Sequence, residues 1–478
     1  MEIFIVCVFI IGYLAITLEH NLKIDKLVPA LLMMAIAWAG VAFGLDGFTT
    51  WFDSGAHHLV DGFANLPLHD AAHGVRESSK AWWFEHTLLH HFGKTCEILI
   101  FLVGAMTIVE IIDHFDGFST IKSFIKTNKR KTLLWIVCIL AFVLSAIIDN
   151  LTATIVLITI LRKLLSDNKD RIWYAGMIII AANAGGAWSP IGDVTTTMLW
   201  MGDRVSTVKL IEYLILPSLV CMIIPTVIGS FLPAFKGNFE APVEESKPNS
   251  KGPLMLYLGL GMIVFVPIFK TVTHLPPYVG MMLSLGIVAL VAEVISSRQF
   301  HMSDVSEELD EEQKAIQTHG VVDPTAAESG HHSSPTFRAL SKIEMPSILF
   351  FLGILMTVAA LESLGLIYMF GNSVTSNMSD NTFVLLMGAG SAIVDNVPLV
   401  AASMGMFNLQ DYAVDNHLWH FIAYSAGTGG SMLIIGSAAG VVAMGMEKIS
   451  FFWYLKNMAW LALIGFLAGA AIFMLTVG

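Results

Sequence analysis

One six-residue phrase occurs twice in this chain, each time inside a long apolar stretch, and it restricts the possible folds more than any other feature. The first copy is Ser145-Ala146-Ile147-Ile148-Asp149-Asn150 and the second is Ser391-Ala392-Ile393-Val394-Asp395-Asn396. A charged side chain at the centre of a membrane costs about 2.5–3.5 kcal/mol on insertion scales, so such residues usually face a cavity and mark an ion or proton path. The repeated Asp-Asn pair therefore predicts a duplicated functional site.

A glycine-rich interruption follows each phrase further along the chain. The first is Asn183-Ala184-Gly185-Gly186-Ala187-Trp188-Ser189-Pro190-Ile191-Gly192-Asp193, and the second is Gly427-Thr428-Gly429-Gly430-Ser431-Met432-Leu433-Ile434-Ile435-Gly436-Ser437. Glycine pairs permit close packing between helices, and they also permit a membrane helix to unwind and expose backbone carbonyls to an ion. Because the interruption recurs behind each Asp-Asn pair, we favour the unwound helix.

The composition is typical of a polytopic membrane protein. Of 478 residues, 55% are hydrophobic and 13% are charged, and apolar runs of near-membrane length recur along the chain. The first run begins with Met-Glu and lacks a basic n-region and a cleavage site, so we interpret it as a span rather than a signal peptide. The four cysteines show no disulfide or zinc spacing. The net charge of −12 is concentrated in two loops, and we expect no nucleic-acid partner.

Two series of apolar segments follow the same order. The first consists of spans 3–18, 27–44 and 94–113, an interrupted stretch 132–164, a span broken at glycines over 171–203, and a closing span 209–235. The second consists of spans 254–270, 278–297 and 344–362, an interrupted stretch 381–408, a broken span 417–447 and a closing span 450–476. We predict an all-α membrane protein with two repeats, 1–235 and 254–478, joined by a cytoplasmic linker 236–253. Short amphipathic pieces are expected at about 115–128 and 364–378.

Each interrupted stretch is either two short spans or one re-entrant helical hairpin. As a hairpin it leaves five crossings per repeat, and an odd number makes the repeats inverted relative to each other, as in many transporters. On that topology most of the 26 Lys and Arg residues lie on one side, which the positive-inside rule makes cytoplasmic. We therefore predict that the hairpin 132–164 enters from the cytoplasm and that both termini are extracytoplasmic.

Two loops stand apart from the repeats. The loop 45–93 is rich in histidine and extracytoplasmic on this topology. His86 and His90 are one helical turn apart, so this loop is a candidate for pH sensing or metal capture, or is an exposed polar loop without a particular role. The loop 298–342 is acidic and polar, which predicts a flexible cytoplasmic tether.

The polar residues around the repeated phrases suit a small hard cation. Asp149, Asp193 and Asp395 would supply carboxylates, and dehydrated Na⁺ or Li⁺ prefers oxygen ligands to imidazole or thiolate. No Lys or Arg lies in either phrase or interruption, which disfavours an organic-anion site. The neutral oxygens nearby belong to Asn150, Thr152, Thr154, Thr195, Thr196, Thr197, Ser391, Asn396, Thr428, Ser431 and Ser437.

The acids also predict a counter-ion for transport. A partly desolvated carboxylate can hold a proton that a metal ion displaces, so we hypothesise Na⁺/H⁺ exchange with Asp149 and Asp395 as the primary ligands. Glu110 and Glu362 are candidates for the proton path, unless they lie at helix ends and are merely solvated. No His-Glu-x-x-His motif or nucleophile–base pair is present in a span, so we expect neither an enzyme nor a cofactor. An arsenite/antimonite-type permease and a passive channel are the alternatives.

Along nearly its whole length the chain resembles the NhaD-type sodium/proton antiporters of the ion transporter superfamily. The resemblance is carried by Ile148-Asp149-Asn150-Leu151-Thr152, Asn183-Ala184-Gly185-Gly186, Ser189-Pro190-Ile191-Gly192-Asp193-Val194-Thr195-Thr196 and Asp395-Asn396-Val397-Pro398. It implies a dimeric antiporter of the bacterial inner membrane, in which two opposed hairpins and two unwound helices surround a site for Na⁺ or Li⁺ and protons. It also implies that ten residues are functional: Asp149, Asn150, Thr152, Asn183, Asp193, Thr195, Thr196, Ser391, Asn396 and Ser431.

The hairpin tips depart from those of related dicarboxylate symporters. In that group the tips look like Ser-Asn-Thr, whereas this chain carries Asp-Asn at Asp149-Asn150 and Asp395-Asn396. The difference argues against carboxylate transport and agrees with the absence of basic residues. The loops 45–93 and 298–342 are not part of the resemblance.

Overall fold

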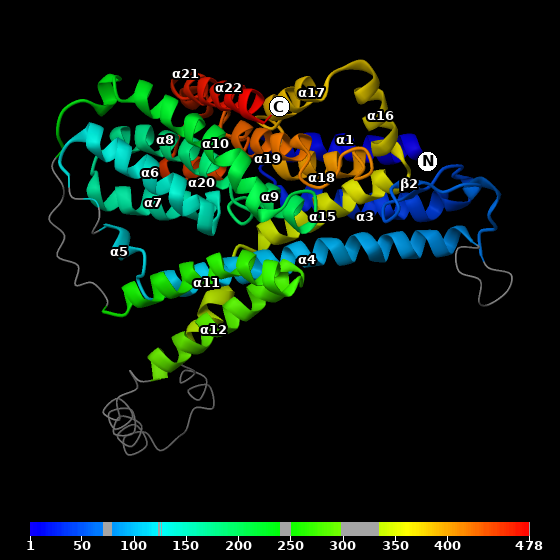
Figure 1. Ribbon diagram of the computed structural model, residues 1–478, viewed down its shortest axis with the longest axis horizontal. Coiled ribbons are helices and arrows are strands. Elements are labelled where there is room, and N and C mark those ends of the chain that lie inside the picture. The colour runs from blue at the N-terminus through cyan, green and yellow to red at the C-terminus, as the bar shows by residue number, and fades with distance from the viewer. Residues whose placement is uncertain (70–78, 123–124, 126, 240–249, 298–333, 478) are drawn as a thin grey trace, which may run out of the picture. The chain divides into compact units, whose positions relative to one another are not determined.

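The structure is a computed structural model that describes residues 1–69, 79–122, 125, 127–239, 250–297 and 334–477 (Figure 1). Within these residues almost all regular structure is helical. The exception is a two-stranded antiparallel pair, β1 (Phe52–Asp53) and β2 (His58–Leu59), in which Phe52 faces Leu59. Most of the tether expected over 298–342 and part of the linker 236–253 lie outside the described residues.

Eight helices of the described part are long and apolar enough to cross a membrane, which confirms the predicted all-α membrane class. Their positions match the expected spans closely. The long apolar helices, together with the shorter first one, are α1 (Glu2–Thr17), α3 (Leu27–Gly44), α4 (Lys80–His114), α6 (Arg130–Ile148), α10 (Thr207–Gly229), α11 (Gly252–Thr273), α12 (Pro277–Ser297), α15 (Met345–Ser363) and α22 (Ala459–Thr476).

The four interrupted segments are each two helices joined at the expected break. The pairs are α6 with α7 (Asn150–Leu164), α8 (Asn168–Gly186) with α9 (Val194–Met201), α17 (Asp380–Gly390) with α18 (Asn396–Met406), and α19 (His417–Gly429) with α20 (Ala438–Glu447). In each pair the second helix begins at a side-chain cap: Asp149, Asp193, Asp395 or Ser437 accepts a backbone N–H of the first turn. Such caps satisfy donors that a helix start leaves open.

Shorter helices connect these elements. They are α2 (Glu19–Leu22), η1 (Leu45–Gly47), η2 (Phe63–Asn65), α5 (Ser119–Lys122), η3 (Pro233–Phe235), α14 (Pro335–Lys342), α16 (Leu366–Asn377) and α21 (Phe451–Asn457). The amphipathic piece expected at 364–378 corresponds to α16. Of the piece expected at 115–128, the described residues form only the four-residue α5.

The prediction of a loop up to residue 93 was wrong, because α4 begins at Lys80. Lys80 is buried and donates its ammonium protons to the carbonyls of Asp46 (2.7 Å) and Phe48 (2.9 Å). Two helical turns later Thr87 accepts the Trp51 indole N–H at 3.1 Å. The part of the histidine-rich stretch with His86, His90 and His91 is therefore helical and is anchored to the core through Lys80 and Thr87, a pattern that the histidine content concealed.

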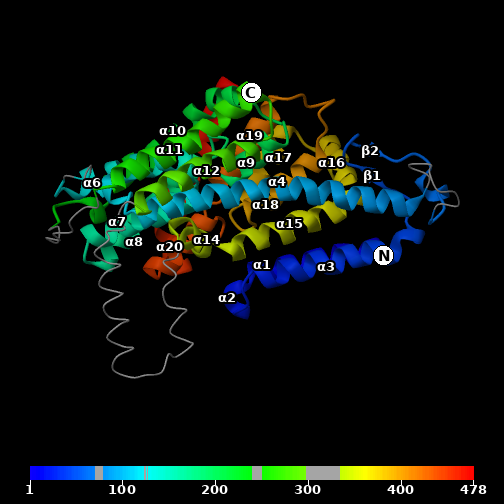
Figure 2. The ribbon, with the colours of Figure 1, turned by 90° about the horizontal axis from the view of Figure 1, so that it is seen from below.

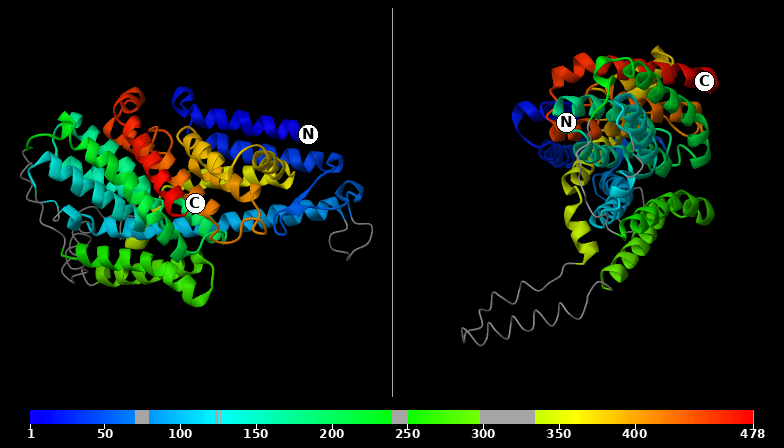
Figure 3. Two further views of the ribbon diagram at one scale, coloured as in Figure 1. Left: turned by 45° about the horizontal axis from the view of Figure 1, so that its top comes forward. Right: turned by 90° about the vertical axis from the view of Figure 1, so that its left-hand side faces the viewer.

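The chain divides into two compact units. The first comprises Met1–Leu102, Lys122–Ser246 and Met345–Gly478, and it contains all four interrupted helix pairs. Within it α6 packs on α8, α17 on α19, α10 on α22, and α3 on both α1 and α15. Figure 2 shows α1, α3 and α15 side by side, and Figure 3 shows the red α22 next to the green α10.

Close backbone approach holds the α3–α15 contact in the first unit. A Cβ on Gly353 would lie 2.7 Å from the backbone of Ala30, so only glycine fits there. The Trp38 indole donates to the Met356 carbonyl at 2.8 Å across the same contact.

The second unit comprises Val103–Ile121 and Lys247–Glu344. In it α11 packs against α12, and the Ser284 hydroxyl donates to the Met262 carbonyl at 2.8 Å. Glu293 of α12 accepts the hydroxyl protons of Ser334 and Thr336 at the start of α14. Glu110 lies in this unit.

Polar contacts join distant chain segments of the first unit at each of two ends. At one end Glu447, at the close of α20, accepts from Arg162 at 2.7 Å and from Arg171 at 2.9 Å. At the other end the turn after α9 meets the segment after α18, where the Ser206 N–H donates to Asp415 at 2.6 Å and Arg204 donates to the Met404 carbonyl at 3.3 Å. The first hairpin, α6 and α7, therefore opens toward the loops near Glu447. The second hairpin, α17 and α18, opens toward the loops near Asp415.

Replacing Glu447 by Ala tests the first of these ends. Glu447 is 1% exposed, and its loss leaves Arg171 partly buried without its carboxylate. We expect a loss of stability of about 2–4 kcal/mol, seen as a lower unfolding temperature of the detergent-solubilised protein. Glu212→Ala breaks an exposed pair with Lys209 and should leave the unfolding temperature unchanged. Equal unfolding temperatures for the two variants would contradict the assignment.

Candidate functional site

The tip of the first hairpin is a strained turn at Asp149. Its φ of 84° lies in the left-handed region, which residues other than glycine rarely adopt. The carboxylate accepts the Thr152 backbone N–H at 2.7 Å and the Thr152 hydroxyl at 3.0 Å. Backbone strain of this kind persists where the surroundings enforce it and is common at functional sites. The turn holds the Asp149 carboxylate at the junction of α6 and α7, beside the hydroxyl of Thr152.

The next residue, Asn150, points into the protein interior. Its amide nitrogen donates to the Asn183 side-chain oxygen at 3.0 Å and to Asp193 Oδ2 at 3.2 Å. Asn183 in turn donates to the Ser437 hydroxyl at 3.0 Å. A single chain of side-chain hydrogen bonds therefore runs from the first hairpin through both glycine interruptions.

Asp193 lies at the centre of the site, and we call this carboxylate with the residues that hydrogen-bond to it the junction. It is 3% exposed, and Oδ1 caps α9 by accepting the Thr195 N–H at 3.2 Å. Oδ2 accepts from two amides, Asn150 at 3.2 Å and Asn396 at 3.3 Å. One carboxylate oxygen is thereby shared by the two Asp-Asn phrases, which lie about half the chain length apart in the sequence.

The second hairpin tip has a different electrostatic setting. Asp395 caps α18 by accepting the Val397 N–H at 3.3 Å, and its carboxylate lies 3.9 Å from the Lys26 ammonium. Asp395 therefore has a charged partner, whereas Asp193 Oδ2 accepts from neutral amides.

Buried hydroxyls lie in the hairpins and in the broken helices. Thr196 donates to the Asp193 carbonyl, Ser391 to the Gly388 carbonyl, and Ser431 to the Thr428 carbonyl. A hydroxyl that donates its proton to the backbone keeps its oxygen lone pairs available. The hydroxyl-bearing residues that the structure buries here are Thr154, Thr195, Thr196, Thr197, Ser391, Thr428, Ser431 and Ser437.

The glycine pairs hold the hairpins against the broken helices. A Cβ on Gly185 would collide with the Phe142 backbone of the first hairpin. On Gly429 it would collide with the Gly388 carbonyl and the Ser391 hydroxyl of the second. Both interpretations of these glycines thus apply, since they permit close packing and each precedes an unwound segment.

Not all residues proposed from the sequence gather at this site. Asp149 and Thr152 bond each other at the first hairpin tip, and Glu110 lies in the second compact unit. The proposed residues that hydrogen bonds link around Asp193 are Asn150, Asn183, Thr195, Thr196 and Asn396. Glu362 and His90 line a separate cavity, and His86 stacks on Trp82 with ring centroids 4.7 Å apart.

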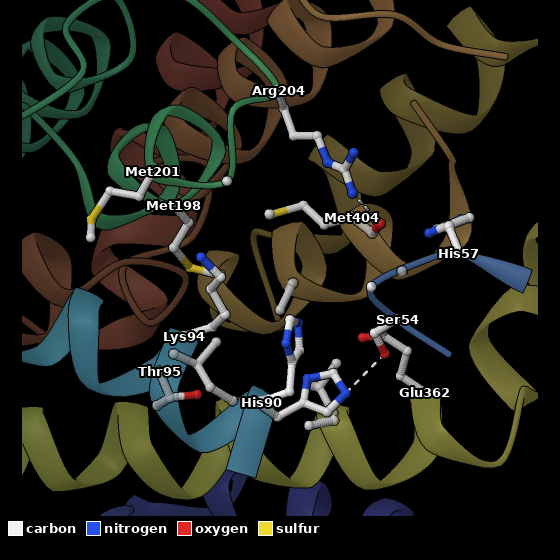
Figure 4. Close-up of a pocket in the computed structure, with 18 of the residues that line it drawn as sticks. Ser54, His57, His90, Lys94, Thr95, Met198, Met201, Arg204, Glu362 and Met404 are labelled. Atoms are coloured by element: carbon white, nitrogen blue, oxygen red, sulfur yellow. Dashed lines mark hydrogen bonds between the residues drawn. The ribbon is translucent and has the colours of Figure 1, made fainter. Parts of the chain in front are cut away.

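The cavity around Glu362 has a volume of about 440 Å³ and is shown in Figure 4. It lies at the end of the first unit where Arg204 and Met404 meet, and the Ser54 hydroxyl in it contacts the His91 imidazole at 2.9 Å. Burial, with the nearby Arg204 charge, lowers the pKa of His57 to about 4, so this imidazole is neutral at physiological pH. The charged and titratable side chains that line the cavity are His57, His90, His91, Lys94, Glu97, Arg204 and Glu362.

An apolar cluster connects the lining of this cavity with the residues next to Asp193 and Asn396. Met198, Leu355 and Val397 are buried together, and Val194 packs against them. Met198 and Leu355 also line the cavity. Val194 follows Asp193 and Val397 follows Asn396 in the chain, so the cluster that contacts the cavity is adjacent in sequence to both residues.

Ser437, which the sequence proposed as a source of neutral oxygen, occupies in the second interruption the place that Asp193 occupies in the first, after the same Gly-Gly and single-Gly spacing, and its hydroxyl accepts from Asn183. One participant was not in the set proposed from the sequence. Lys26 lies in a short polar loop before α3, and no pattern in the sequence connects it to Asp395.

Comparison with known proteins finds transporters. A family model described as "Citrate transporter" (CitMHS) matches residues 13–419. "Sodium/proton antiporter 1" of Arabidopsis thaliana is 38% identical over 98% of this chain and 71% of its own length. "Na(+)/H(+) antiporter NhaD" of Vibrio cholerae is 30% identical over 94% of this chain and 86% of its own length.

Among solved structures, the YdaH transporter of Alcanivorax borkumensis has a similar fold. It matches with a TM-score of 0.53 and 12% sequence identity, covering 94% of this chain and 97% of that one. At this identity the likeness concerns the fold alone.

Replacing Gly429 by Ala tests the contact between α19 and the second hairpin. The added Cβ would collide with the Gly388 carbonyl, so we expect the unfolding temperature to fall by the equivalent of about 1–3 kcal/mol. Gly390→Ala is the matched control, since a Cβ there meets nothing within 4 Å. If thermal unfolding of Gly429→Ala matched that of Gly390→Ala, the close approach would be disproved.

Proposed function

The chain belongs to the family of the NhaD-type sodium/proton antiporters, and from this premise we propose that it exchanges Na⁺ or Li⁺ for H⁺ across a membrane by alternating access. Proton and cation compete for the same buried carboxylates. The proposal concerns the ion species, the residues that bind them and the order of events.

The shared hydrogen bonding of Asp193 is the observation that carries this proposal. Asp193 is buried, and its Oδ2 accepts from two neutral amides, those of Asn150 and Asn396. Neutral donors stabilise a buried carboxylate but do not neutralise it, and an unneutralised buried charge is costly. Taking up a proton or a small cation removes that cost, so the site is suited to hold one or the other.

The ligands for the cation would come from both phrases. Asp149, Asp193 and Asp395 provide carboxylate oxygens, and rotation of the Asn150 or Asn396 amide would present its carbonyl oxygen instead of its nitrogen. The buried hydroxyls of Thr195, Thr196, Ser391, Thr428 and Ser431 offer further oxygens, in keeping with the preference of hard cations for oxygen. In the proton-loaded state the carboxylate keeps its amide partners.

Citrate is the substrate class printed for the matching family model, and the site argues against it here. An organic tricarboxylate requires positive side chains or unopposed helix starts, whereas three of the four helix starts carry Asp149, Asp193 and Asp395. Repulsion between these acids and a carboxylate substrate favours a cation. Nothing among the comparisons supports an arsenite or antimonite permease.

The cavity around Glu362 is proposed as the extracytoplasmic vestibule of the pathway. Glu362 and His90 in it supply titratable groups, and the apolar cluster of Met198, Leu355 and Val397 separates it from Asp193. We also propose that His86 and His90 sense pH and that Glu110 takes part in proton transfer.

For topology we propose inverted repeats with extracytoplasmic termini, in a homodimer in a bacterial inner membrane. The first hairpin opens near Glu447 and the second opens near Asp415. These separate positions support entry of the two hairpins from opposite sides of the membrane. The distribution of Lys and Arg supports the assignment of the Glu447 end to the cytoplasm.

Asp149→Asn should abolish Na⁺-driven proton movement in proteoliposomes, and Asp193→Asn should do the same, because an amide cannot exchange a proton for a metal ion. Asp61→Asn, which changes an exposed loop residue in the same way, should retain wild-type exchange. Exchange at the wild-type rate by Asp149→Asn would refute its assignment. Citrate uptake without Na⁺/H⁺ exchange by the wild type would refute the proposed function.

Competition between Na⁺ and protons determines how the half-saturating Na⁺ concentration changes with pH. Protons that occupy the carboxylates must be displaced by Na⁺, so the half-saturating Na⁺ concentration should rise as the pH falls, by up to about tenfold per pH unit for each proton displaced. The measurement is the initial exchange rate against Na⁺ concentration at several pH values with the membrane potential clamped. A half-saturating concentration independent of pH would exclude a shared carboxylate.

A further inference from the structure

A second, smaller cavity of about 70 Å³ lies beside Asp395. Its polar lining comes from the end of α1, the segment before α3 and the second hairpin tip. The residues that contribute it are Tyr13, Thr17, Glu19, Lys26 and Asp395. The remainder of the lining is aliphatic or methionine. This cavity is distinct from the one around Glu362, and the two share no lining residue.

Lys26 contributes the positive charge of this cavity. Its ammonium lies 3.9 Å from Asp395 Oδ2 and 4.4 Å from the centroid of the Phe350 ring. Both ion-pair partners are mostly buried, with 22% and 17% of their side chains exposed. Lys26 therefore connects the start of α3 and a ring on α15 with the tip of the second hairpin.

The spacing of this ion pair differs from that of the structural pairs at Glu447. There Arg162 and Arg171 approach the carboxylate to 2.7 and 2.9 Å, which are hydrogen-bonded distances. At 3.9 Å the Lys26 ammonium neutralises Asp395 without a direct hydrogen bond. A long, flexible lysine at this distance can be displaced by another cation.

Tyr13 supplies an independent indication of a ligand. Its hydroxyl oxygen is buried, lines the cavity and has no hydrogen-bond partner among the described residues. A buried polar group without a partner costs about 1–3 kcal/mol. Because Asp395 and Glu19 line the same cavity as Tyr13, its oxygen is suited to bind a cation there.

We propose that Lys26 is a tethered cation that neutralises Asp395 when the transported ion is absent, and that Na⁺ or Li⁺ reaches Asp395 through this cavity by displacing it. The proposal rests on the proposed function and extends it. Asp395 then has a positive partner both before and after the ion arrives, which avoids an uncompensated buried carboxylate.

The displacement also has a mechanical consequence. Lys26 precedes α3, which packs with α1 and α15, while Asp395 belongs to the second hairpin. The ion pair therefore ties the hairpin to this three-helix layer. An incoming cation that takes over Asp395 removes the tie, so occupancy of the site and freedom of the hairpin are coupled.

The test measures Na⁺ affinity in variants of Lys26. The full-length protein in detergent is titrated with radioactive Na⁺ at one alkaline pH, and exchange is measured in proteoliposomes at the same pH. Lys26→Met removes the competitor, so the half-saturating Na⁺ concentration should fall by about three- to fivefold. Lys26→Arg keeps the charge and should stay near the wild-type value. Lys23→Met removes an exposed lysine of the same loop and should change nothing.

A double mutant isolates the pair. In the Asp395→Asn background, Lys26→Met should have no effect on Na⁺ binding, because the partner is already gone. Tyr13→Phe, which deletes one hydroxyl, should weaken Na⁺ binding about twofold or more, and it serves as the test if Lys26→Met does not fold.

Unchanged or weakened Na⁺ binding by folded Lys26→Met would overturn the proposal, as would wild-type binding by Tyr13→Phe if Lys26→Met cannot be made. Failure of the proposed function looks different. In that case wild-type proteoliposomes show no Na⁺/H⁺ exchange, while tighter Na⁺ binding by Lys26→Met would still support the tethered cation.

Discussion

The site depends on one carboxylate oxygen that accepts two amide protons. Asp193 Oδ2 receives Asn150 from the first hairpin and Asn396 from the second, so it is the point at which the two halves of the chain meet. Each hairpin is held in place by a glycine pair that allows backbone contact, at Gly185 and at Gly429. Without those contacts the amides would not reach Asp193. The hydrogen bonds to Asp193 therefore depend on the close packing of the hairpins against the broken helices.

The two halves of the site are similar in geometry and different in charge. Where the first interruption has Asp193, the second has Ser437, and where Asp149 is paired with Thr152, Asp395 faces Lys26. A fully symmetric site would bury four acids with no fixed positive charge. Replacing one acid by serine and partnering another with lysine lowers that electrostatic cost while leaving carboxylates free to change partners.

The sequence predicted the helices, the four interruptions and most of the junction, because each depends on a local and repeated pattern. Asn150 and Asn396 came from the repeated phrases, Asp193 from the first interruption and Asn183 from the family resemblance, and the structure joins them by hydrogen bonds. The extension of α4 to Lys80 was missed because histidines obscured its buried face. Lys26 was missed because its role depends on the tertiary contact of α3 with the second hairpin, which no local pattern encodes.

Proton release on Na⁺ binding tests the central claim most directly. The purified wild-type protein is mixed with NaCl in a weakly buffered solution, with choline chloride as the ionic-strength control, and the released protons are counted against bound Na⁺. If the two ions share carboxylates around Asp193, Na⁺ should release protons at pH values where those carboxylates are protonated, and Asp193→Asn should release fewer. Saturating Na⁺ binding without proton release at any pH would contradict a shared site.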